Sequence, residues 1–132
     1  MWFNIDPRSS MPIYQQLIEG VKGAVAKGTL TPGEKLPSVR ELAGQITINH
    51  NTIAKAYQEL EREGIIETLR GRGTFVAEQR MTLSREERKQ VIKGMLERML
   101  VEAHYLQLEE EELLEILEES VREWYRERRE QT

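Results

Sequence analysis

The sequence predicts a mainly α fold with one small β-hairpin, in which a three-helix head precedes a tail of two helices. Two capping-box patterns and several amphipathic stretches indicate the helices. A glycine-rich turn between two short apolar runs indicates the hairpin. With 132 residues the chain can bury a core without metals or disulfides. We expect the head to span residues 1–79 and the tail residues 80–132.

The first two predicted helices are separated by a loop. The first helix begins near Pro12, which a first helical turn tolerates, and ends at Gly28. Residues 31–37 are dense in proline and glycine and predict a loop. Ser38 and Glu41 then form a capping box that starts the second helix. Its apolar positions, at i, i+3, i+4 and i+7, are Val39, Leu42, Ala43 and Ile46.

A third helix and a basic hairpin complete the head. Asn49 is a good N-cap, and helical spacing continues over residues 49–63, with Ile53, Ala56, Tyr57 and Leu60 expected in the core. Gly64 ends this helix. Two short strands then flank the turn at residues 70–73, Arg-Gly-Arg-Gly. Helix, turn, helix and basic hairpin in this order predict a winged helix-turn-helix, with the hairpin as the wing.

The polar side of the third helix indicates duplex DNA as a partner. A helix of this length fits the major groove, amide side chains suit adenine, and a glycine-flanked arginine turn can reach the backbone or the minor groove. Taken singly, each side chain is as typical of a solvated surface, an N-cap or a surface ion pair, but their combination favours DNA. The candidate DNA-binding residues are Arg40, Asn49, His50, Asn51, Thr52, Lys55, Gln58, Arg70, Gly71 and Arg72.

The net charge of −4 is unevenly distributed. Residues 1–79 hold nine Lys/Arg and nine Asp/Glu, whereas residues 80–132 hold ten and fourteen, so the acidity belongs to the tail. Local clusters of positive charge matter more for DNA than the total. The cations within or beside the helix-turn-helix and the hairpin are Lys35, Arg40, Lys55, Arg70 and Arg72. Because the head is not strongly basic, we expect modest nonspecific affinity.

The tail predicts a homodimer. Ser84 and Glu87 supply a second capping box, and a final helix is expected from Glu109 to about Arg129. Two helices alone offer little core for their broad apolar stripes, so a second copy of the chain is expected to cover them. The candidate dimerisation residues are Leu96, Met99, Leu100, Leu113, Leu117, Val121 and Trp124.

Enzymatic and metal chemistry have little support in the sequence. The chain has no cysteine, no nucleophile–base pair, no phosphate loop and no metal motif, so we expect no enzyme activity, no cofactor and no metal. His104 lacks a second histidine at ligand spacing, and the acidic run 109–112 suits a helix amino terminus better than a cation site. No signal peptide or membrane-length apolar run occurs, which predicts a cytoplasmic protein without membrane contact.

Four spaced motifs resemble the GntR family of bacterial transcription regulators. They are Pro37-Ser-Val-Arg-Glu-Leu-Ala, Asn49-His-Asn-Thr-Ile-Ala-Lys-Ala-Tyr, Leu60-Glu-Arg-Glu-Gly-Ile-Ile and Gly71-Arg-Gly-Thr-Phe-Val, and the match covers about residues 8–78. The short helical tail resembles the YtrA subfamily. The resemblance implies a dimer that binds a near-palindromic operator and often represses its own operon, frequently one encoding an ABC transporter. It also implies DNA contacts at Arg40, Asn51, Thr52 and Arg70-Gly71.

Two other classes of function remain as alternatives. A winged helix can serve as a protein-interaction module without operator binding, with the tail pairing to another protein. The chain can also be a sensor that binds a small-molecule effector between head and tail, and the sequence leaves the existence of an effector open. The chain has Asn49-His50 where family members often have Ser-Arg, and Ala54 where some have arginine. The operator sequence is therefore not carried over from relatives.

Overall fold

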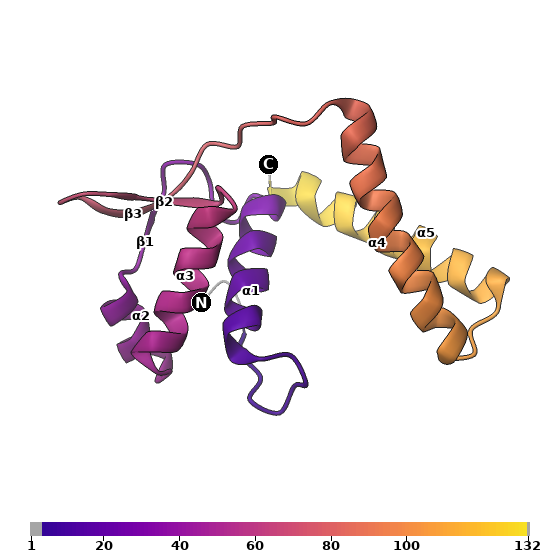
Figure 1. Cartoon of the computed structure of the whole chain (residues 1–132), viewed down its shortest axis with the longest axis horizontal. Coiled ribbons are helices and arrows are strands. Elements are labelled where there is room, and N and C mark those ends of the chain that lie inside the picture. The colour runs from indigo at the N-terminus through magenta and orange to yellow at the C-terminus, as the bar shows by residue number, and fades with distance from the viewer. Residues whose placement is uncertain (1–3, 132) are drawn as a thin grey trace. The chain divides into compact units, whose positions relative to one another are not determined.

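A computed structural model describes residues 4–131 of the chain. The chain divides into two compact units, one from the amino terminus to Arg80 and one from Met81 to Glu130, which we call the head and the tail. The head contains α1 (Ile13–Lys27), β1 (Lys35–Leu36), α2 (Val39–Ile46), α3 (His50–Arg62), β2 (Ile66–Leu69) and β3 (Gly73–Val76). The tail contains α4 (Arg85–Tyr105) and α5 (Glu110–Gln131) (Figure 1).

The predicted ends of the head helices are confirmed. Pro12 precedes α1, and Gly28 ends it in the left-handed region with φ 85°, a conformation that glycine adopts without strain. The Ser38 side chain caps α2, and the Asn49 side chain caps α3. Thr47, with φ 53°, turns the chain between these two helices. The helix boundaries are therefore set by local capping chemistry that the sequence displays directly.

The sheet contains one strand that the sequence did not predict. The hairpin of β2 and β3 has the expected antiparallel pairing, with Ile66 opposite Val76 and Leu69 opposite Gly73. The expectation that residues 31–37 form only a loop was wrong, because Lys35 and Leu36 form β1 on the other side of β3. Two residues are too few to show a strand period, so only the pairing with a distant segment defines β1.

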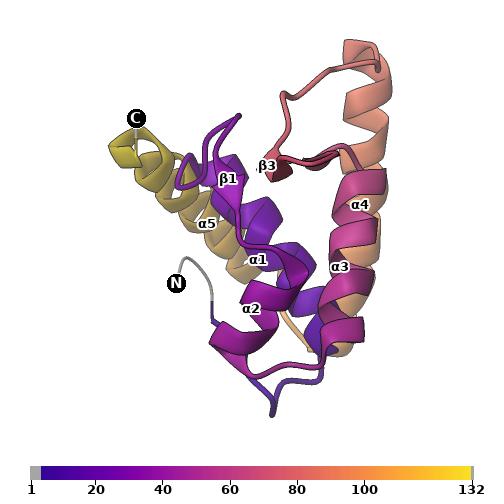
Figure 2. The same ribbon diagram turned by 90° about the vertical axis from the view of Figure 1, so that its left-hand side faces the viewer.

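The core of the head lies between the three helices and the inner face of the sheet. α1 packs against α3, and α2 crosses α3 near its amino terminus (Figures 1 and 2). The sheet contributes Leu36, Ile66 and Val76, each no more than 2% exposed. All four core positions predicted for α3 are buried. The backbone of α3, from which the side chains of its exposed flanks project, is consequently held in place by a packed scaffold.

The tail has almost no core of its own. α4 begins at the predicted capping box of Ser84 and Glu87, and a short turn through Gln107, with φ 58°, leads to α5. The two helices diverge from this turn (Figure 2). Ala103 is the one buried residue among the described residues of the tail. Within residues 4–131, no helix combines the length and apolarity needed to cross a bilayer.

Candidate nucleic-acid interface

The amino terminus of α2 presents Arg40 to solvent. The Ser38 hydroxyl accepts a hydrogen bond from the Glu41 backbone N–H at 3.1 Å, and the Glu41 carboxylate accepts one from the Ser38 N–H at 3.1 Å. The pKa of Glu41 is lowered, chiefly because the Ser38 backbone N–H donates to its carboxylate and, to a lesser degree, because the Ser38 hydroxyl lies beside that carboxylate, and both stabilise the charged form. Arg40 lies inside this capped first turn and is exposed. The capping box thus fixes the backbone from which Arg40 projects.

The N-cap and the first turn of α3 hold four of the candidate DNA-binding residues. The Asn49 side-chain oxygen accepts a hydrogen bond from the Asn51 N–H at 2.8 Å, so that oxygen serves as the helix cap. His50 and Asn51 are exposed, and Thr52 is half-buried. Because the amide oxygen of Asn49 is occupied, its NH₂ group is the part of this side chain that remains for a ligand. The helix amino terminus itself favours a phosphate at this point.

Lys55 and Gln58 lie one and two turns further along α3, and both are exposed. The Lys55 ammonium lies over the ring of Tyr14 on α1, with Nζ 3.9 Å from the ring centroid. A cation over an aromatic face is attracted by the ring quadrupole. Lys55 is therefore turned toward α1, whereas nothing in the described structure holds the Gln58 side chain by a hydrogen bond.

Tyr57 connects α3 to the segment that precedes α2. Its side chain is 7% exposed, and its hydroxyl donates a hydrogen bond of 2.7 Å to the Pro37 carbonyl. Burial, with a smaller contribution from the Glu41 charge, raises the pKa of Tyr57 to about 12. This bond fixes the start of α2 relative to α3, and thereby the position of Arg40 relative to the exposed side of α3.

The wing presents its tip to solvent. Because Leu69 pairs with Gly73, the turn consists of Arg70, Gly71 and Arg72, and the Arg72 N–H donates to the Leu69 carbonyl at 2.9 Å. Gly71 has φ 78°, which a residue with a side chain rarely adopts. All three turn residues are exposed. The two guanidinium groups are thus carried on a tight turn that extends beyond the packed part of the head.

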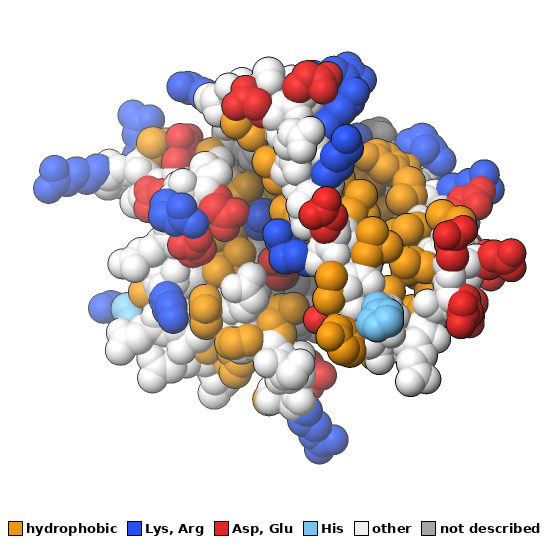
Figure 3. All heavy atoms as spheres, turned by 45° about the vertical axis from the view of Figure 1, so that its right-hand side comes forward, with side chains coloured by type: hydrophobic (Ala, Val, Ile, Leu, Met, Phe, Trp, Pro, Cys, Tyr) orange, Lys and Arg blue, Asp and Glu red, His pale blue; other side chains and the backbone are white. Residues whose placement is uncertain are grey.

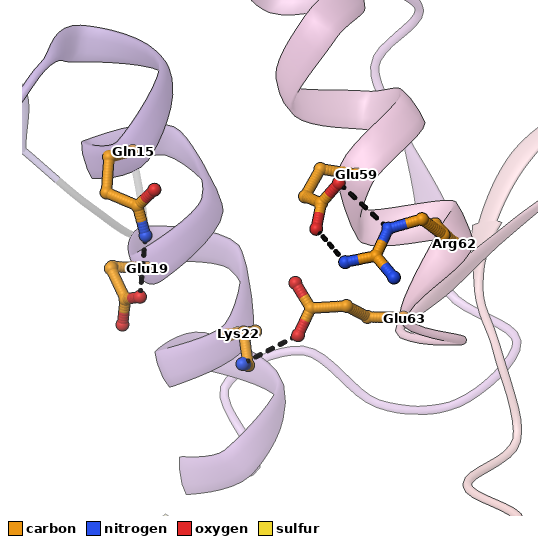
Figure 4. A network of polar contacts seen from close by, with 6 residues as sticks. All are labelled: Gln15, Glu19, Lys22, Glu59, Arg62 and Glu63. Carbon is orange, nitrogen blue, oxygen red and sulfur yellow. Dashed lines mark hydrogen bonds and ion pairs between the residues drawn. The ribbon is translucent and has the colours of Figure 1, made fainter. Parts of the chain in front are cut away.

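Ion pairing separates the cations of the head into two groups. On the side where α1 meets α3, Lys22 pairs with Glu63 at 2.9 Å and Arg62 pairs with Glu59 (Figure 4). Within residues 4–131, no carboxylate lies within salt-bridge distance of Arg40, Arg70 or Arg72. The alternative interpretation of Arg40 as a member of a surface ion pair therefore finds no partner in the described chain. Cations without partners are the ones available to an anionic ligand.

Comparison with known proteins shows which family has this architecture. Residues 13–76 match the family described as bacterial regulatory proteins, gntR family. The transcriptional repressor YtrA of Bacillus subtilis (strain 168) is 54% identical over 115 residues, which are 87% of this chain and 88% of that protein. The chain belongs to the GntR family. The resemblance to the YtrA subfamily is confirmed by the same relative.

Solved structures extend the GntR assignment to the fold. A transcriptional antiterminator from Listeria monocytogenes EGD-e matches with a TM-score of 0.81 and 38% identity, over 94% of this chain and 92% of that chain. The DNA-binding domain of AraR, solved with operator ORX1, matches with a TM-score of 0.51 and 30% identity, over 58% of this chain and 99% of that chain. The GntR-family chain is thus a DNA-binding transcription regulator with a winged helix-turn-helix head, not an enzyme.

Two contacts at the candidate nucleic-acid interface were not predicted from the sequence. Tyr57 was expected only in the core, and its hydroxyl bond to Pro37 was missed; Tyr14 was given no role, although its ring holds Lys55. A tyrosine on an otherwise apolar helix face is the one signal that pointed to a buried polar partner. No pattern in the sequence indicated the contact between Tyr14 and Lys55, because its two residues lie on separate helices.

Proposed function

We propose that two copies of this chain form a dimer that binds a near-palindromic operator and represses transcription of its own operon. The observation that carries the proposal is the exposed polar side of α3 beside unpaired arginines on α2 and the wing tip. The AraR DNA-binding domain, which shares this head, was solved with an operator. The B. subtilis relative is named a repressor.

We assign α3 to the major groove and the wing to the flanking backbone or minor groove. The amides of Asn51 and Gln58 suit bidentate pairing with adenine, and His50 and Lys55 suit guanine acceptors or phosphate. Thr52, with the Asn49 cap, lies where the helix amino terminus attracts a phosphate. In the same arrangement, Arg40 reaches a base or a phosphate from α2. Arg70, Gly71 and Arg72 contact DNA without reading its sequence.

Titration of DNA with variant proteins tests these roles. Asn51→Ala is expected to weaken binding to the operator by about 1–3 kcal/mol, or roughly 5- to 150-fold, with little change for scrambled DNA. Arg70→Ala is expected to weaken binding to both DNAs and to flatten the dependence of affinity on salt. Lys22→Ala is the matched control, because this cation is already paired with Glu63. It should leave both affinities near those of the unsubstituted chain.

Gel retardation at low salt, with the DNA upstream of the chain's own gene, measures these affinities. Unchanged binding in both Asn51→Ala and Arg70→Ala would refute the assignment of α3 and the wing to DNA. No retardation of any DNA by the unsubstituted chain would refute operator binding altogether. That second result would favour the alternative, a winged-helix module that binds another protein.

The tail supports the dimeric part of the proposal. Large apolar side chains cover α4 and α5 and are exposed, for example Ile92 at 55% and Leu114 at 57% (Figure 3). A groove of about 300 Å³ next to the α4–α5 turn is lined mostly by leucines, including Leu100 and Leu117. A monomer rarely leaves so many apolar side chains in one region in contact with water. We propose that a second copy covers them, through the seven predicted dimerisation residues and their exposed neighbours.

The mass of the chain in solution tests the dimer. Light scattering on an eluting sample should give twice the mass of one chain, and Leu117→Glu should reduce it to that of a single chain by placing a charge on the apolar face. Glu115→Gln, an exposed position on the same helix, is the control and should remain dimeric. A monomeric unsubstituted chain that still binds its operator would contradict the dimer while leaving DNA binding intact.

A further inference from the structure

Lys35 lies on the outer face of the three-stranded sheet. In β1 its neighbour Leu36 is buried, with 2% of its surface exposed, so Lys35 points to the opposite, solvent side. Lys35 stands opposite Phe75 of β3, and Gly73 lies two residues nearer the wing tip on the same face of β3. The base of the Lys35 side chain is therefore fixed by strand pairing.

The Lys35 side chain extends along β3 toward the wing tip. A methyl group added to Gly73 would lie 2.9 Å from Cε and 3.5 Å from Nζ of Lys35. Such a separation from Cε is shorter than any ordinary carbon–carbon contact. The missing side chain of Gly73 thus leaves the space that the end of Lys35 fills. The ammonium is brought to the strand residue that directly follows Arg72.

The charged groups around Lys35 leave it available to a ligand. Within residues 4–131, no carboxylate lies within 4 Å of its ammonium. Glu41 interacts with Lys35 only weakly and at longer range, and its oxygen already accepts the Ser38 N–H. Glu67 shares the outer face but lies on β2, with β3 in between. Arg70 and Arg72 are exposed cations of the same hairpin, and within residues 4–131 neither has a carboxylate within salt-bridge distance.

We propose that Lys35 is a third cation of the wing, and that it binds a backbone phosphate of the operator from the space that Gly73 leaves open. A lysine ammonium is a compact point charge, suited to phosphate and not to reading a base edge. The phosphate contact rests on the proposed binding of the wing to DNA. It adds β1, the strand that the sequence did not predict, to the DNA-binding surface.

The salt dependence of binding measures the proposed contact. Each neutralised phosphate contributes about 0.9 to the slope of log affinity against log salt. Lys35→Gln should therefore lower the slope by about 0.9 per bound head, or about 1.8 for a dimer on two half-sites. From 50 to 200 mM salt, the affinity ratio of unsubstituted chain to variant should fall by about 3.5-fold per head. The decrease should be the same on operator and scrambled DNA.

Three further variants separate the contact from structural effects. Lys35→Arg keeps the charge and should restore the slope, whereas Lys22→Gln, which removes a cation paired with Glu63, should not change it. Gly73→Ala should lower the slope in the unsubstituted chain but not in the Lys35→Gln chain, because its effect on the slope acts through Lys35. Comparing the two backgrounds cancels the backbone strain at Gly73, whose φ is 122°.

The outcomes are distinguishable from failure of the proposed function. If the unsubstituted chain binds no DNA, the function itself is wrong and the Lys35 contact fails with it. If it binds, and Lys35→Gln retains the full salt slope, the contact is refuted while the function stands. A loss of affinity with an unchanged slope also refutes it, since this pattern would assign Lys35 a structural role.

Discussion

Replacement of Tyr57 by phenylalanine removes the hydroxyl that ties α3 to the start of α2. The hydrogen bond measures 2.7 Å, the tyrosine is 7% exposed, and the accepting carbonyl belongs to Pro37, which is half-buried. Loss of such a bond costs about 1–2 kcal/mol when water only partly reaches the abandoned carbonyl. For a head of this size that corresponds to a fall in Tm of about 4–16 °C. The aromatic ring remains, so packing is preserved.

The unsubstituted chain and Tyr57→Phe should differ in their free energy of unfolding, and the pH dependence of this difference identifies its cause. The pKa of Tyr57 is raised from 10 to about 12 by folding, so its contribution to stability is complete below pH 10 and is lost as pH rises through 12. At pH 11 the loss is about 1.4 kcal/mol, one unit of the shift. The phenylalanine variant cannot titrate at this position. The free energy of unfolding of Tyr57→Phe should therefore be lower than that of the unsubstituted chain by the full amount at pH 9, and by almost nothing at pH 11.

Urea denaturation of both proteins at pH 7, 9 and 11, followed by circular dichroism, measures this difference. The comparison cancels the titration of every other group, since only position 57 changes. Tyr105→Phe is the control, because this tyrosine is 76% exposed, and it should show no pH-dependent difference. A gap between the unsubstituted chain and Tyr57→Phe that stays constant from pH 9 to 11 would refute the claim that the buried hydroxyl stays protonated.

Three further predictions concern local contacts of the head. Ser38→Ala should destabilise the head by about 1 kcal/mol through loss of the α2 cap, measured by urea denaturation; equal stability would contradict the capping role. Glu41→Gln should lose less stability than the unsubstituted chain as pH falls below the ordinary carboxyl pKa of 4.5, since folding lowers the pKa of Glu41. A double-mutant cycle of Tyr14→Leu and Lys55→Met should give a coupling of about 0.5–1 kcal/mol; zero coupling would show an incidental contact.

The helices and the hairpin were predictable because their causes lie within a few residues. Ser38 and Glu41 are three residues apart, and the Asn49 cap acts on Asn51. The glycines of the wing turn supply backbone angles that other residues avoid, whatever surrounds them. Capping, turn chemistry and apolar periodicity therefore appear directly in the sequence, and the structure confirms each of these elements with its expected type.

The contacts that position the interface depend on distant segments. β1 exists only through pairing with β3, Tyr57 bonds to a carbonyl twenty residues earlier, and Lys55 contacts Tyr14 on another helix. The pattern of polar residues along one helix does not show which of their side chains will contact a neighbouring helix or strand. For this reason the sequence predicted both Lys55 and Gln58 as DNA-binding residues, although in the structure only Lys55 contacts an aromatic ring of α1.

The charge of the head shows why composition underestimates a DNA-binding surface. Residues 1–79 carry equal numbers of cations and carboxylates, yet the carboxylates are not shared evenly. Glu59 and Glu63 pair with Arg62 and Lys22 where α1 meets α3, while the arginines of α2 and the wing have no such partner within residues 4–131. A paired cation must give up its partner before it meets a phosphate, and an unpaired one does not. Although residues 1–79 carry no net charge, these arginines of the described chain are thus left open to an anionic ligand, and pairing in the fold, not the total charge, decides which cations are open in this way.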